Sequence, residues 1–143
     1  MAFTSQESPR RQIDATKSVS IALPIISATT NTNIIDLEMV STYPSLEKVA
    51  FIAQTGAATA NSGNAAAINM VLQHSATNNA ANMVNVPNLV LVSIASNAAT
   101  YPATNASWTA PVGLYRYVQL QVAQGAGGSN AANTANVTFS LAF

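Results

Sequence analysis

The sequence predicts an all-β fold, an antiparallel β-sandwich of jelly-roll type with about seven to eight strands. Three observations predict it. Apolar residues recur at every second position in several short segments, as in strands with one face in a core and one face outside. Segments rich in Gly, Asn and Pro lie between them, and these residues favour turns. No segment carries the apolar spacing of a convincing amphipathic helix.

The strand pattern recurs along the whole chain. In order, it covers residues 19–27, 34–40, 48–53, 68–74, 88–95, 114–122 and 137–143. The turn-rich segments between them are 31–33, 42–45, 61–64, 85–88, 100–105 and 124–130. Segments 48–53 and 88–95 are more continuously apolar, which favours central strands. Pro24 places segment 19–27 at an edge or a bulge, because proline cannot donate to a ladder.

The clearest alternation identifies the expected core. In three segments, every second side chain is apolar and the ones between are mostly polar or small. Strands of this kind bury their apolar face. The expected core residues are Ile68, Met70 and Leu72, then Leu114, Val118, Leu120 and Val122, and finally Val137, Phe139, Leu141 and Phe143.

The chain length predicts one domain and a short arm. With 143 residues, the chain is long enough for a single core. Residues 1–18 are predicted to form an N-terminal arm, either a solvated tail or a segment that orders on a neighbour, and residues 19–143 the sandwich. The N-terminus lacks the apolar stretch of a secretory signal. The aliphatic run at 21–26 is too short for a membrane span, so no membrane partner is expected.

Charged residues are scarce and unevenly distributed. They make up 7% of the chain, the net charge is zero, and only Arg116 follows Lys48. Without a basic patch, no nucleic-acid partner is expected. The uncharged loops 56–66 and 75–88 are rich in Ala, Asn, Ser and Thr. They are suited to docking on another neutral protein surface, and a compositional habit of the source genome is the competing interpretation.

The residues needed for catalysis are sparse, and the chain is not expected to be an enzyme. The sequence has no Cys, and its only His is His74. No GxSxG elbow positions a serine nucleophile beside that histidine. Asp36 and Glu38 share one strand face, which indicates a solvated acidic face rather than a calcium site. No catalytic, metal or cofactor site is therefore predicted.

Arg116 is the one late charge, and its position allows two interpretations. By alternation it lies on the same strand face as Leu114 and Val118, so burial would require a carboxylate partner, with Asp36 or Glu38 as the candidates. Without such a partner in the same subunit, Arg116 would indicate an inter-subunit contact. Alternatively, Gly113 flips the start of the strand and leaves Arg116 outside.

Three aromatic residues lie in or beside the predicted turns. Tyr43, Tyr101 and Trp108 are next to prolines or near them, where aromatic side chains commonly seal the ends of a sandwich. Stacking on sugar rings, as in a lectin-like module, is the alternative.

Three segments, taken in order, carry a family resemblance. They are TTNTNIIDLEMV at 29–40, INMVLQHSATNN at 68–79, and residues 110–143. The pattern begins with Thr32 to Leu37 and continues with the pair Leu72-Gln73. It ends with Gly113, then Arg116-Tyr117, and then an alternating strand, a glycine-rich turn and a closing strand. In these features the chain resembles the jelly-roll cement, or decoration, proteins on the heads of tailed bacteriophages. It departs from that pattern in a longer N-terminal segment, residues 1–28.

The resemblance implies a structural role in the virion. Such proteins form trimers on the outer capsid surface and clamp neighbouring major capsid proteins against internal DNA pressure. The implied partners are the major capsid protein and further copies of this chain. Candidate inter-subunit or capsid contacts are Arg10, Arg11, Lys17, Asn78, Asn79 and Arg116. A phage fibre or lectin-like module that binds glycan is the alternative function.

Overall fold

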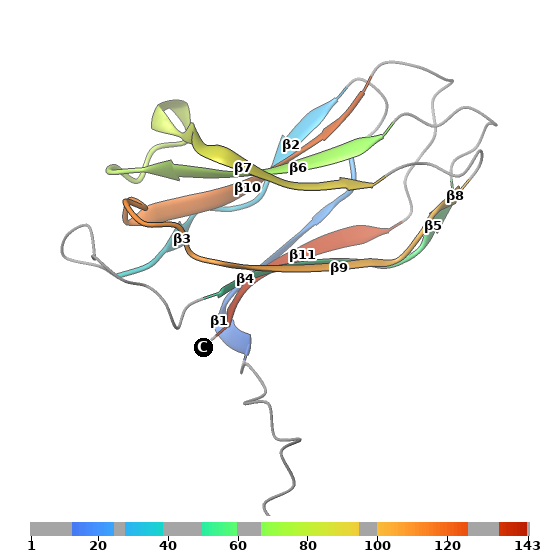
Figure 1. Cartoon of the computed structure of the whole chain (residues 1–143), viewed down its shortest axis with the longest axis horizontal. Helices are drawn as coiled ribbons and strands as arrows, with labels where there is room; N and C mark the ends of the chain where they lie inside the picture. Colours follow the sequence, from blue (N-terminus) through green and yellow to red (C-terminus); the bar gives the residue numbers. More distant parts are fainter. Residues whose placement is uncertain are drawn as a thin grey trace, which may run out of the picture.

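The structure is a computed structural model that describes residues 13–24, 28–38, 50–59, 67–94, 100–125 and 135–142. Two antiparallel sheets lie one above the other (Figure 1). The first has four strands in the order β1 (Ile13–Ala22), β11 (Asn136–Ala142), β4 (Ala50–Thr55) and β9 (Thr104–Thr109). This arrangement confirms the predicted all-β antiparallel sandwich.

The second sheet has five strands, and its central strand is β10 (Tyr117–Gln124). One side of β10 pairs with β6 (Ile68–Ser75), which in turn pairs with β7 (Val84–Ile94). The other side of β10 pairs first with β2 (Thr29–Asn31) and then with β3 (Ile35–Asp36). These two short strands therefore form one interrupted edge.

Two further pieces of regular structure complete the described part of the chain. The strands β5 (Ala58–Thr59) and β8 (Thr100–Tyr101) pair with each other beyond the ends of β4 and β9. A short 3-10 helix, η1 (Ala80–Asn82), lies in the connection between β6 and β7.

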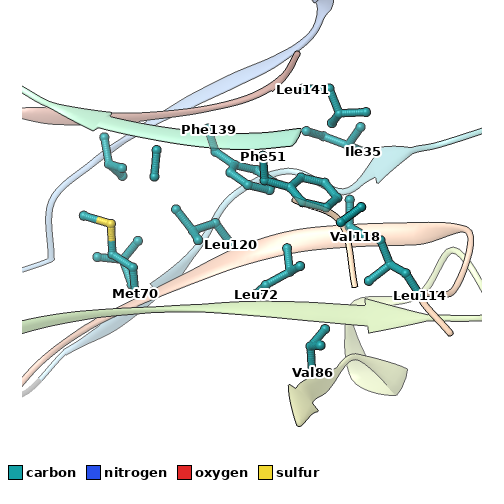
Figure 2. Packing of buried hydrophobic residues seen from close by; sticks show 14 of the residues in the cluster. Ile35, Phe51, Met70, Leu72, Val86, Leu114, Val118, Leu120, Phe139 and Leu141 are labelled. Carbon is teal, nitrogen blue, oxygen red and sulfur yellow. The ribbon is translucent and has the colours of Figure 1, made fainter. Parts of the chain in front are cut away.

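The core lies between the two sheets and is made by the alternating apolar faces (Figure 2). Phe139 of β11 stacks on Phe51 of β4, with ring centroids 5.6 Å apart. From the opposite sheet, Met70, Leu72 and Leu120 point toward this pair. Burying side chains of this size supplies the dominant favourable term in folding. The expected core residues are confirmed in all three segments, except that Phe143 lies outside the described residues.

The positions of the two apolar strands differ from one another. β4 is a central strand, as the run 48–53 predicted, because it pairs with β11 on one side and β9 on the other. The prediction that 88–95 is central is wrong, because β7 is the last strand of its sheet. Its register shifts opposite residues 70–73. Pro87 lies in this bulged part, where the lost backbone donor is tolerated.

Two predicted turns are strands instead. Segment 85–88 belongs to β7, and part of segment 100–105 belongs to β8 and β9. Trp108 therefore lies within a strand, opposite Phe51, and not in a turn. β9 is made mostly of Thr, Asn, Ala and Ser. It therefore lacks the alternation of apolar and polar side chains from which a strand is predicted.

The N-terminal strand begins earlier than expected. β1 starts at Ile13, which pairs with Ala142, so the boundary placed at residue 18 falls inside this strand. Pro24 follows the strand, and β1 is an edge strand, in agreement with the prediction for segment 19–27. The sandwich therefore includes part of the segment that was predicted to be an arm.

Candidate functional site

A bulge in β1 directs the side chain of Lys17 toward the other sheet. Between the pairs Ile13↔Ala142 and Ser18↔Ser140, four residues of β1 lie opposite a single residue of β11, Leu141. Bulges of this kind bend an edge strand and redirect its side chains. Lys17 lies in the bulge, and its Nζ reaches across to the second sheet.

Lys17 joins the edges of the two sheets. Its Nζ donates to the backbone carbonyl of Asp36 over 2.8 Å and pairs with Oε1 of Glu38 over 2.6 Å. Glu38 has a φ of 59°, which is uncommon for a residue other than glycine. Its backbone N–H donates to Oδ1 of Asp36 over 2.8 Å, and this Asx-type bond supports the turn.

Arg116 completes the same cluster from the start of β10. Its Nε and Nη2 donate to the two carboxylate oxygens of Asp36 over 2.7 and 2.8 Å. Such a two-point pair fixes the geometry of both groups. The guanidinium also lies over the ring of Tyr117, 5.2 Å from its centroid, which is within the range of a cation–π contact.

The hydrogen bonds between Arg116 and Asp36 shift the pKa of both groups. Hydrogen bonding from Arg116 lowers the pKa of Asp36 to about 2, with further lowering from the Glu38 N–H and from Lys17. The same hydrogen bond raises the pKa of Arg116. Both groups therefore stay charged across the physiological range. The four side chains Lys17, Asp36, Glu38 and Arg116 are called the ion cluster below.

The structure decides between the two interpretations of Arg116. Gly113 has a φ of 81° and the strand begins only at Tyr117, so Arg116 is exposed and the expectation of burial is wrong. Asp36 is its partner within the same chain, as the sequence suggested. Because Arg116 has a carboxylate partner in its own chain, its position does not indicate an inter-subunit contact.

The interrupted edge beside the ion cluster is held by a threonine. Thr32, which is 4% exposed, donates its backbone N–H to the carbonyl of Leu120 over 2.9 Å. Its Oγ1 accepts the N–H of Leu120 over 2.9 Å. The side chain thus replaces a ladder bond between β2 and β3, and no buried backbone group of Leu120 is left unpaired.

The outer faces of both sheets carry neutral hydrogen-bonding groups. On the five-stranded sheet, Gln119 donates to Gln73 over 2.7 Å, and Gln73 donates to Asn85 over 2.9 Å. Gln119 is only 1% exposed although it points away from the core. On the four-stranded sheet, the hydroxyls of Ser18 and Ser140 lie 2.7 Å apart. Gln119, Gln73 and Ser140 are buried, so these polar groups are satisfied by hydrogen bonds to one another and to their neighbours.

One end of the sandwich presents apolar and neutral residues to the outside. Ser75 pairs with Tyr117, so the connection 76–83 and the segment 110–116 lie at this end. Val112 is 84% exposed and Tyr115 is 42% exposed. Residues 76–82 are all exposed and uncharged. This end, formed by residues 76–83 and 110–115 and followed by Arg116 of the ion cluster, is called the loop end below.

His74 holds the loop end to the sheet. Its Nδ1 accepts the backbone N–H of Tyr115 over 3.2 Å, and the two rings lie 4.5 Å apart. This bond requires an unprotonated Nδ1. Burial lowers the pKa of His74, which agrees with a neutral imidazole.

The candidate contact residues fall into three groups. Lys17 and Arg116 belong to the ion cluster. Asn78 and Asn79 are exposed at the loop end, where the Asn79 side chain caps η1 by accepting the N–H of Ala81 over 2.9 Å. Arg10 and Arg11 lie outside the described residues, as do Glu7, Glu47, Lys48 and Tyr43. Alternation and composition predict neither the bond of Thr32 to Leu120 nor the bond of His74 to Tyr115, because both depend on non-local pairing.

Among the described residues, no three His, Cys, Asp or Glu side chains come together in a way that would hold a metal ion. None of the helices in that part of the chain is long and apolar enough to span a membrane. No family model matches the chain, and no curated protein sequence matches it either.

Proposed function

We propose that the chain is a structural virion protein, a capsid decoration protein that forms trimers on the outer head surface and clamps neighbouring major capsid proteins. One observation carries this proposal. Every charged side chain that the structure describes is paired within the ion cluster, and exposed positions on the strands carry neutral amides such as those of Gln54, Asn69 and Asn105. Such a surface fits a neutral protein surface, on which a charged residue would lose its water without a partner.

The loop end supplies the surface that binds the shell in this proposal. It combines exposed Val112 and Tyr115 with the uncharged residues 76–82. Apolar area and an aromatic anchor are typical of the centre of a protein interface. Three such ends in one trimer would bind with avidity, so each contact can be weak. The resemblance to phage cement proteins supports the same assignment.

The test compares particles of the virus that encodes this chain, produced with and without its gene. Electron cryomicroscopy should show extra density in groups of three on the outer head surface. Particles that lack the protein should release their DNA at a lower temperature. Attachment should persist at about 1 M NaCl, where the Debye length is about 3 Å, because no ion pair carries it. Heads without this density, or release of the protein by moderate salt, would contradict the proposal.

A pair of lysine variants locates the binding surface. Val112→Lys places a charge at the centre of the loop end and should weaken attachment to heads by about a hundredfold, since an unpaired charge buried at an interface costs several kcal/mol. Asn31→Lys adds the same charge on β2, away from that end, and should leave attachment unchanged. Equal attachment of both variants would show that the loop end does not bind the shell.

A further inference from the structure

The two open sides of the sandwich differ in their charge. On one side, β1 of the four-stranded sheet lies against β3 of the other sheet, and the ion cluster bridges them. On the opposite side, β9 lies against β7, and neither strand contains an Asp, Glu, Lys or Arg. These are called the charged side, formed by β1, β2 and β3, and the uncharged side, formed by β7 and β9.

Edge strands usually carry features that prevent contact with other chains. Charged side chains, lysine above all, and bulges are common ones. The charged side has both, in Lys17 and in the bulge between Ile13 and Ser18. On the uncharged side, the register shifts and Pro87 interrupt β7 between Asn85 and Val92, but neither β7 nor β9 carries a charged side chain. The Cα pairing with β6 is regular again from Val92 to Ile94.

The exposed residues of the uncharged side are suited to packing against another protein. Val84, at the start of β7, is 52% exposed. Asn85 and Asn105 are exposed on β7 and β9, and the amide chain from Gln119 through Gln73 ends on Asn85. Burying an exposed valine and neutral amides at an interface removes no charged group from water.

We propose that copies of this chain meet through the uncharged side. A second copy fits because its own β7 and β9 are equally neutral, and because the chain carries no net charge that would oppose association. Contact through the charged side would instead remove the paired charges of the ion cluster from water, which costs free energy. This inference rests on the proposed trimer, and it assigns the surface that faces the three-fold axis.

The test measures the mass of the purified full-length chain in solution by light scattering and by sedimentation. The wild-type chain should have three times the monomer mass of 14.8 kDa. Val84→Lys on β7 and Asn105→Lys on β9 should each shift the mass toward the monomer and raise the dissociation constant by about a hundredfold, since like charges meet at the axis. Both positions are exposed, so folding should be retained, which circular dichroism would verify.

The matched control is Asn31→Lys, an equally exposed asparagine on the charged side. It should retain the wild-type mass. A monomeric wild-type chain, or variants at 84 and 105 with unchanged mass, would overturn the inference. Loss of assembly in Asn31→Lys alone would overturn it as well.

The two proposals fail in different ways. A trimer that depends on Val84 but has no affinity for heads would support this inference and contradict the function proposed above. A monomer that coats heads would contradict this inference and leave the attachment to the shell standing.

Discussion

The charged and uncharged sides of this sandwich are alike in backbone and different in chemistry. Each consists of one edge from each sheet, and on the charged side one of these edges is shared by β2 and β3. On the charged side, Lys17 of β1 bonds to residues 36 and 38 and links the two sheets, and Arg116 pairs with Asp36 within the five-stranded sheet. On the uncharged side, neither edge strand has a charge. The difference teaches that the charged side chains of the ion cluster link the sheets on one side only, and that the sheets meet on the other side without charged residues in their edge strands.

Thr32→Val should have the largest effect on stability. The change keeps the shape of the side chain but removes the oxygen that accepts the N–H of Leu120. That buried N–H would then lack its partner, at a cost of about 2 kcal/mol in the free energy of unfolding. Urea denaturation of both proteins measures the difference. A stability equal to that of the wild type would mean that the edge beside the ion cluster does not depend on this bond.

Thr55→Val is the matched control, next to β9 of the uncharged side. Thr55 pairs with Thr104 of β9, and its Oγ1 is buried without a hydrogen-bond partner in the part of the chain that the structure describes. Removing an unpaired buried hydroxyl should be neutral or stabilise the fold by up to about 1 kcal/mol. Destabilisation equal to that of Thr32→Val would erase the contrast between the two positions.

His74 should make stability depend on pH in the mildly acidic range. Burial lowers its pKa from 6.5 in the folded chain, so the unfolded chain binds a proton first. The free energy of unfolding should therefore be highest above 6.5 and should fall as the pH decreases through and below that value. His74 is the only histidine in the sequence, so urea unfolding between about pH 7.5 and about pH 5 isolates its contribution.

His74→Gln provides the comparison for this titration. It should be nearly independent of pH over the same interval, because no histidine remains. Since His74 accepts the N–H of Tyr115, the amide resonance of Tyr115 in the wild-type chain should shift as the imidazole is protonated. An amide that does not respond would show that His74 does not hold the loop end.

Asp36→Asn should have the smallest effect, because the ion cluster is largely exposed and solvent screens its interactions. The pKa of Asp36 is lowered from 3.8 to about 2 in the folded chain. Its stabilising contribution is therefore present above 3.8 and is lost as the pH falls toward 2. The wild-type chain and Asp36→Asn should differ slightly in thermal midpoint near pH 5 and become equal near pH 2. A difference that persists at the lower pH would assign the effect to something other than the carboxylate charge.

The strands with clear alternation could be predicted from the sequence, and the short or polar ones could not. Phe139 and Leu120 each belong to a run with period two, and such a run has one way to bury its apolar face. β9 reads TNASWT and lacks that contrast, so only its pairing with β4 makes it a strand. Two-residue strands such as β3 depend wholly on the neighbour that supplies their hydrogen bonds.

The candidate site was only partly predictable. The pairing of Arg116 with Asp36 followed from the scarcity of charge, since few carboxylates are available to a late arginine. The bonds of Lys17 to residues 36 and 38 could not be predicted, because they depend on a bulge in β1 that the local sequence does not indicate. The position of β7 at an edge was also missed, since an apolar run has the same composition at an edge as in the centre.

The sequence by itself determined the all-β character, the members of the core and the near absence of charge. These depend on alternation and composition, which are local. Only the tertiary structure decided that Asp36, 80 positions away, and not Glu38 is the partner of Arg116, and that the uncharged strands β7 and β9 share one side. Those outcomes depend on register and bulges, and the packing of both sheets against each other fixes register through contacts that no short segment contains.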